Sequence, residues 1–88
     1  MSLLQAGNAR EAELRLRSAI AADGTNATAL MGLGIIAHQT GHLAPALDLF
    51  DRALAAAPGL AAAHVNRGNT LAAMGRHAEA ADAFGRAI

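Results

Sequence analysis

The chain has 88 residues, which is enough for one small domain. Hydrophobic residues make up 53% of it, but alanine is by far the commonest type and only two residues are aromatic, so the composition favours closely packed helices over a broad core of bulky side chains. Seven arginines balance seven acidic residues and cysteine is absent, which excludes a disulfide scaffold and a cysteine-ligated zinc site and argues against nucleic-acid binding.

The first predicted helix runs to about Ala22. Asn8, followed by Glu11 three residues later, has the capping-box pattern that begins a helix. A second helix is predicted from Asn26, as its N-cap, to about Thr40. A glycine follows directly, in the position where a left-handed residue ends many helices.

A third helix is predicted from Leu43 to Ala57, because apolar residues recur there at three-four spacing and a Pro-Gly pair follows. The same pattern then predicts helices over Ala61–Met74 and His77–Ile88. No segment alternates apolar and polar residues with the period of a strand. We therefore expect an all-α fold.

The chain carries an internal repeat with a 34-residue period. Glycine recurs at this spacing. A large apolar residue also recurs at it, and so does the alanine three residues further along the chain. The matching columns are Gly7, Gly41 and Gly75; Leu16, Phe50 and Phe84; and Ala19, Ala53 and Ala87. A fixed spacing of this length indicates a stacked array of two-helix units.

This 34-residue helix–turn–helix unit resembles the tetratricopeptide repeat family. The matching residues are Gly34 and Gly68 within the first helices, Gly41 and Gly75 between helices, Ala46 and Ala80, Phe50 and Phe84, Ala53 and Ala87, and Pro58. The resemblance implies a helical-repeat solenoid with right-handed stacking of antiparallel helix pairs. It divides the single array at 1–88 into a partial unit (1–24), a full unit (27–60) and a nearly full unit (61–88). Because the units are cut at both ends, we expect a fragment of a longer array.

No catalytic, cofactor or metal site is predicted. The chain has no lysine for a phosphate-binding loop, and its Gly-Leu-Gly segment lies within a predicted helix instead of after a strand. His38 and His42 are four residues apart, but Gly41 ends the helix between them, which removes the shared face that two metal ligands would need. We therefore predict a protein that is not an enzyme and needs no cofactor.

The family resemblance implies recognition of a protein or peptide partner in a concave groove lined by the first helices. The candidate groove residues are Thr28, Met31, Ile35, His38, Gln39, Val65, Asn66 and Asn69. Asn66 and Asn69 match the positions where relatives hold a peptide backbone with asparagine amides, which both donate and accept. The alternative is that both are ordinary polar residues of a solvated helix face.

Two other functions remain open. The uncapped ends of the array could associate with a second copy to form a homo-oligomer, through the candidates Leu3, Leu4, Phe84 and Ile88. By analogy alone, the chain could also be the targeting part of a larger bacterial transferase. No apolar run approaches the ~20 residues of a membrane span and no secretion signal is visible, so we expect a cytoplasmic protein without a membrane partner.

Overall fold

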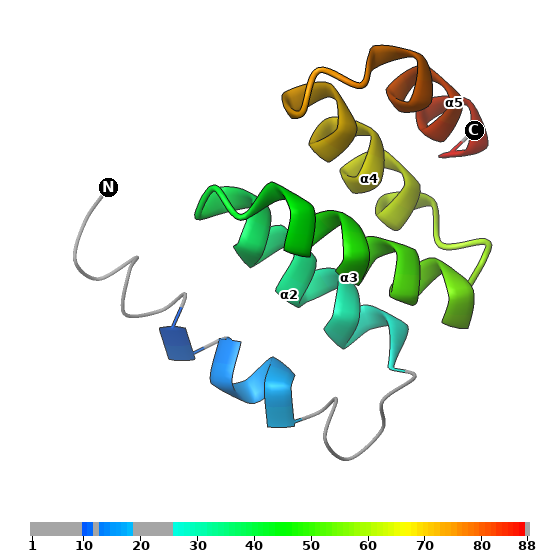
Figure 1. Cartoon of the computed structure of the whole chain (residues 1–88). Helices are drawn as coiled ribbons and strands as arrows, with labels where there is room; N and C mark the ends of the chain where they lie inside the picture. Colours follow the sequence, from blue (N-terminus) through cyan, green and yellow to red (C-terminus); the bar gives the residue numbers. More distant parts are fainter. Residues whose placement is uncertain (1–9, 12, 19–25, 88) are drawn as a thin grey trace.

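The computed structural model describes residues 10–11, 13–18 and 26–87, and within them the protein is all-helical, as predicted. Residues 10–11 and 13–18 are helical. They are followed by α2 (Ala27–Gln39), α3 (Leu43–Ala56), α4 (Ala61–Ala73) and α5 (His77–Ala87) (Figure 1). The predicted cap at Asn8, the end of the first helix near Ala22, and Leu3, Leu4 and Ile88 lie outside the described residues.

The helix ends are where the sequence signals put them, to within one or two residues. Asn26 caps α2, because its Oδ1 accepts a hydrogen bond from the Ala29 amide at 3.0 Å. Gly41 and Gly75 have φ angles of +84° and +79°, in the left-handed region that glycine enters without steric cost. The amide of the residue after each glycine bonds the carbonyl five residues back, at 2.8 Å in both turns. The two turns are therefore the same Schellman motif, one repeat apart.

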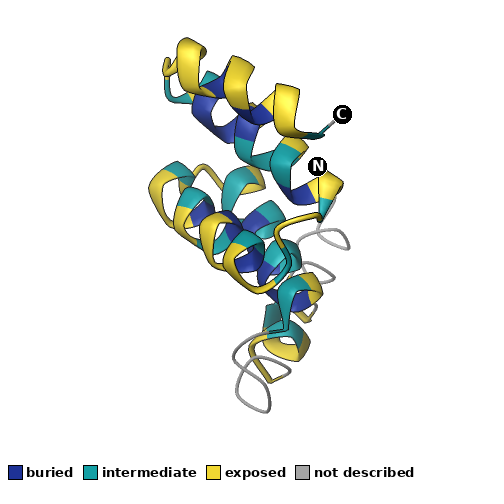
Figure 2. Ribbon diagram, turned by 90° about the vertical axis from the view of Figure 1, so that its right-hand side faces the viewer, coloured by how far each residue is buried: buried dark blue, intermediate teal, exposed yellow. Residues whose placement is uncertain are grey.

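Each helix pair is closed by an aromatic ring that lies against a glycine. The ring of Phe50, on α3, lies against Gly34 of α2, and the ring of Phe84, on α5, lies against Gly68 of α4. Buried alanines and leucines fill the rest of the core. Buried residues lie between the helices, and exposed ones cover their outer surfaces (Figure 2). The fully enclosed alanines are Ala46, Ala53, Ala63 and Ala83. These small residues allow the close helix contact that the composition predicted.

The two pairs stack to form a row. The second helix of the first pair, α3, packs against the first helix of the next pair, α4, and α2 also touches α4. On the other side of α2, Leu16 lies against Gly32: a Cβ built there would be 2.9 Å from Leu16 Cδ1. The helical residues 13–18 thus occupy the layer before α2, and the first helices α2 and α4 are neighbours (Figure 1).

Candidate functional site

Five of the residues predicted from the sequence surround one recess between the first helices α2 and α4. Its volume is about 130 Å³. The recess is lined by Ile35, His38 and Gln39 from α2 and by Asn66 and Asn69 from α4. None of the lining residues is an acid, a lysine or an arginine, so the recess is an amide- and imidazole-lined surface and not a clamp for a charged group.

The two asparagines differ in how much of their hydrogen-bonding capacity is used. The side-chain amide of Asn66 donates to the Ala62 carbonyl of its own helix at 2.9 Å. This bond uses one N–H and leaves Oδ1 and the second N–H. Asn69 is exposed, and within the part of the chain that the structure describes no hydrogen bond engages its side chain. Both amides therefore have donors and acceptors available at the recess.

A chain of hydrogen bonds fixes the histidine of the recess. Thr70, which is fully buried, donates its hydroxyl to the Asn66 carbonyl at 2.9 Å. His38 Nδ1 lies 2.9 Å from the same hydroxyl oxygen. Because the hydroxyl has one proton and a carbonyl only accepts, both contacts are satisfied when Nδ1–H of His38 donates to Thr70. In the neutral ring Nε2 then remains as an acceptor.

Sequence reasoning missed the role of Thr70. This threonine follows His38 by almost one repeat length, so their positions on consecutive first helices were inferable. The bond between them was not, because it depends on how the two helices are rotated. The bond ties α2 to α4 directly at the recess.

Three other predicted groove residues do not line this recess. Thr28 is exposed and Met31 is half-buried, both nearer the start of α2, and Val65 on α4 is 41% exposed. The candidate site is therefore concentrated at the carboxyl half of α2 and the middle of α4.

Comparison with known proteins gives the family. The sequence model of the family described as Tetratricopeptide repeat matches residues 1–61 and 46–88, which together span the chain. The chain belongs to the tetratricopeptide repeat family. Such repeats generally act as protein-interaction modules, and the fold of this chain supports that general role. No curated protein matches the sequence.

Solved structures of MamA share the fold. One crystal structure of MamA superimposes with a TM-score of 0.85 at 24% identity, over 96% of this chain and 49% of that one. MamA AMB-1 gives a TM-score of 0.81 at 28% identity, over 94% and 49%, and MamA MSR-1 gives 0.81 at 26%, over 94% and 48%. The chain spans about half the length of these MamA chains, and the expected stacked-repeat architecture is confirmed.

Two other histidines of this tetratricopeptide array, His42 and His64, have hydrogen-bond partners within the chain. His64 is half-buried and its Nε2 donates to the Pro58 carbonyl at 2.9 Å. His42 Nδ1 lies 2.9 Å from Thr40 Oγ1, in the turn beyond the helix that carries His38. Among the described residues, no group of three histidine or acidic side chains could hold a metal ion.

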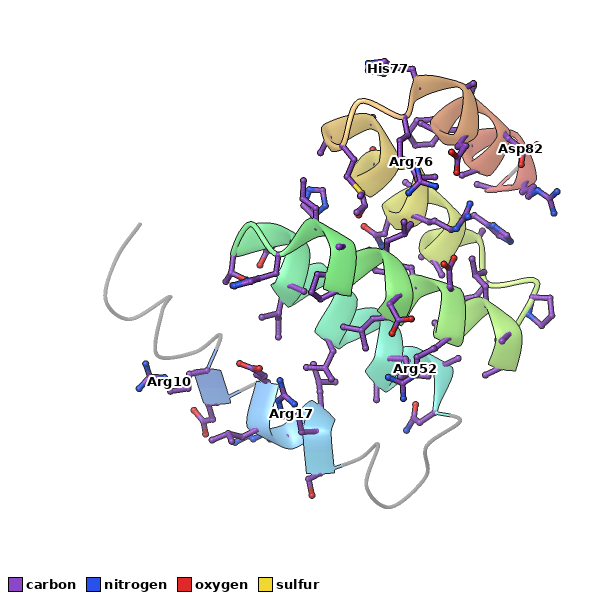
Figure 3. All side chains as sticks on the ribbon, viewed as in Figure 1. Arg10, Arg17, Arg52, Arg76, His77 and Asp82 are labelled. Atoms are coloured by element: carbon purple, nitrogen blue, oxygen red, sulfur yellow. The ribbon has the colours of Figure 1, made fainter. Side chains whose placement is uncertain are left out.

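Most charged side chains cover the outer surfaces of the array, where Arg10, His77 and Asp82 extend from the ribbon (Figure 3). Arg67 departs from this pattern, since its Nε lies 2.6 Å from Asp51 Oδ1 and joins α4 to α3. In the part of the chain that the structure describes, each helix is too short or too polar to cross a membrane.

Proposed function

We propose that the chain is a non-catalytic module that binds an extended segment of a partner protein in the concave groove formed by α2 and α4. The observation that carries the proposal is the recess itself, where the first helices of two consecutive repeats present uncharged amides and an imidazole acceptor side by side. Peptide groups offer one N–H and one carbonyl each, so side-chain amides complement a main chain of any sequence.

The size of the recess supports a peptide segment over a cofactor. Its volume of about 130 Å³ is well below the roughly 300–1,000 Å³ of typical small-molecule sites. A single side chain of the partner would fit beside Ile35 while its main chain bonds the amides. In this arrangement Asn66 Oδ1 accepts from a partner N–H, and Asn69 and Gln39 donate to its carbonyls.

The test is a comparison of peptide binding by the wild type and an Asn66→Ala/Asn69→Ala double variant. Peptides are first selected on the wild-type chain from a random displayed library, and their affinities are then measured by calorimetry. We expect the double variant to bind selected peptides roughly tenfold or more weakly, since each lost hydrogen bond costs about 0.5–1.5 kcal/mol. Arg86→Ala, a change of an exposed side chain on α5, is the control.

Circular dichroism shows whether both variants keep their helices. The Asn66 side chain bonds only its own helix and Asn69 is exposed, so truncating them leaves the helix contacts in place. Equal affinities of the wild type and the double variant for every selected peptide would remove the concave groove as the binding site.

Self-association is a second candidate, and a difference between equivalent phenylalanines favours it. Phe50 is 0% exposed, whereas Phe84 is 37% exposed one repeat later. A second copy stacked on α5 would cover Phe84 as α4 covers Phe50. Sedimentation across a dilution series tests this: we expect mass to rise with concentration, and Phe84→Gln to abolish the rise while Val65→Ser does not. A constant monomer mass for the wild type would contradict it.

A further inference from the structure

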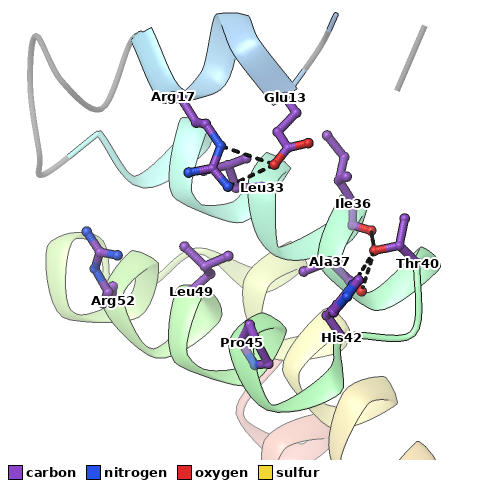
Figure 4. Close-up of a pocket in the computed structure, with 10 residues that line it drawn as sticks. All are labelled: Glu13, Arg17, Leu33, Ile36, Ala37, Thr40, His42, Pro45, Leu49 and Arg52. Carbon is purple, nitrogen blue, oxygen red and sulfur yellow. Dashed lines mark hydrogen bonds and ion pairs between the residues drawn. The ribbon is translucent and has the colours of Figure 1, made fainter. Parts of the chain in front are cut away.

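A second, larger groove lies on a different side of α2, between the helical residues 13–17 and α3. Its volume is about 710 Å³. Figure 4 shows Arg17 and Glu13 on one side of this groove and Arg52 on the other. We call it the outer groove. Its walls are the second helices of two consecutive repeats, so it is separate from the recess between the first helices α2 and α4.

The outer groove combines an apolar floor with a basic group on each wall. Leu33, Ile36 and Ala37 form the floor, on α2, and Pro45 and Leu49 continue the apolar surface onto α3. Arg17 and Arg52 stand on the two walls. Such a surface suits a ligand that has aliphatic side chains and carboxylates together.

A groove one repeat later shares three positions with the outer groove, those of Arg17, Leu33 and Arg52, but differs in charge. It is lined by Asp51, Leu54, Pro58, His64, Arg67, Asp82 and Arg86. There Arg67 pairs with Asp51 at 2.6 Å, across from α4 to α3, and Arg86 pairs with Asp82 at 3.1 Å. Its charges are therefore satisfied within the protein.

The residues at the equivalent positions of the earlier repeat show why, among the described residues, no ion pair bridges the outer groove. Arg17 stands at the position of Asp51, and Leu33 stands at the position of Arg67. The ion pair that bridges the later groove thus has no counterpart, and an arginine faces an apolar floor. At the shared positions, all of which the structure describes, no ion pair therefore joins the two helices across the outer groove.

The charges of the outer groove leave a positive excess. Arg17 pairs with Glu13 of its own helix at 2.8 Å, which neutralises one wall. Arg52 is exposed and, among the described residues, pairs with no carboxylate; the nearby Asp51 is taken by Arg67. Arg52 is thus available to a carboxylate of a partner. Arg17 can exchange its ion pair with Glu13 for one with such a carboxylate.

The geometry points to the outer groove as a docking site for an acidic, aliphatic segment of a partner protein. Leucine, isoleucine or valine side chains of this segment lie on the floor of Leu33 and Ile36. Its carboxylates bind Arg52 and, at the opposite wall, Arg17. This site does not depend on the concave recess and would operate whether or not the recess binds a peptide.

The test uses a random displayed peptide library selected on the wild-type chain, with synthetic fluorescein-labelled copies of the selected peptides measured by anisotropy. We expect a class of selected peptides in which aspartate or glutamate alternates with aliphatic residues. Arg52→Glu should weaken binding of this class about tenfold or more, because attraction at the wall becomes repulsion, and binding should also weaken as salt rises.

Arg86→Glu is the matched control, since Arg86 is the residue one repeat after Arg52 and is exposed in the same way. It should change the affinity of these peptides less than about twofold, as a distant surface charge does. Asn66→Ala/Asn69→Ala should leave their affinity unchanged, which separates this site from the concave recess.

Each of the following results would overturn the proposal. One is a selection that yields no binding peptide, or only peptides that lack carboxylates. Another is that Arg52→Glu and Arg86→Glu weaken peptide binding equally. A selection in which every peptide depends on Asn66 and Asn69 and none on Arg52 would also overturn it, while supporting the concave groove.

Discussion

The ring of Phe50 occupies the space that any side chain at Gly34 would need: a Cβ built there would lie 2.6 Å from Phe50 Cε1. The same distance separates a Cβ at Gly68 from Cε1 of Phe84, one repeat later. The glycine–aromatic contact is therefore the repeated unit of packing within each helix pair. Its two copies differ in their surroundings, because Phe50 is enclosed and Phe84 is partly exposed.

Gly34→Ala should destabilise the protein. Alanine gains about 1 kcal/mol of helix propensity, but overpacking against an enclosed ring typically costs about 1–3 kcal/mol. An approach of 2.6 Å to an enclosed ring puts the overpacking cost at the upper end of this range, about 2–3 kcal/mol. We therefore expect a net loss of about 1–2 kcal/mol in the free energy of unfolding, measured by urea denaturation. The control is Gly85→Ala on α5, where nothing lies near a Cβ; it should be neutral or slightly stabilising. A Gly34→Ala variant as stable as the wild type would contradict the contact.

Gly68→Ala should cost less than Gly34→Ala. The Cβ would meet the Phe84 ring at the same distance, but this ring is 37% exposed and can turn toward solvent, whereas the Phe50 ring at 0% exposure cannot. We expect a net change within about 1 kcal/mol of the wild type, because the gain in helix propensity offsets most of the strain. Urea denaturation of both variants side by side gives the comparison, and equal losses would mean that Phe84 is held as firmly as Phe50.

Thr70→Val tests the hydrogen bonds that join α2 to α4. Valine has nearly the same shape, but at the fully buried position of Thr70 it removes the hydrogen-bond partner of Nδ1 of the half-buried His38. An unpaired polar group there should cost about 1–2 kcal/mol of unfolding free energy, measured by thermal or urea denaturation. Nitrogen NMR of the imidazole should also find the proton on Nδ1 of His38 in the neutral ring of the wild type.

Thr40→Val is the matched control. Thr40 also donates its hydroxyl to a carbonyl four residues back and also lies 2.9 Å from a histidine Nδ1, but it is exposed. Water replaces the lost hydrogen bonds at such a site, so the free energy of unfolding should change by no more than about 0.5 kcal/mol. Equal losses in the two variants would show that burial of Thr70 does not matter.

The sequence predicted the helices well because their ends depend on local chemistry. Asn26 as a cap and Gly41 as a left-handed residue act within a few residues of themselves, so the sequence alone reveals them. The repeat spacing also placed Phe50 and Gly34 in the same helix pair. Local signals and the repeat length together were enough for the fold.

Contacts between helices were less predictable. The bond from His38 to Thr70 and the ion pair of Arg67 with Asp51 depend on how neighbouring helices are rotated, which no local pattern specifies. The outer groove was missed for the same reason, since its walls come from separate helices. A comparison of each charged residue with the residue 34 positions away would have revealed that Arg17 occupies the position that Asp51 occupies one repeat later.

The ion pair between Arg67 and Asp51 should be worth more than the one between Arg86 and Asp82. The Arg67 side chain is 25% exposed and its partner 51%, whereas both side chains of the other pair are about 65% exposed (65% and 64%). Solvent screens exposed pairs, so we expect a coupling energy of about 0.5–1 kcal/mol for the first and about 0–0.5 kcal/mol for the second. Double-mutant cycles with alanine, read by urea denaturation, measure both. Raising the salt concentration should lower the first coupling. A coupling for Arg67 and Asp51 no larger than that of the exposed pair would mean that this contact does not hold α3 and α4 together.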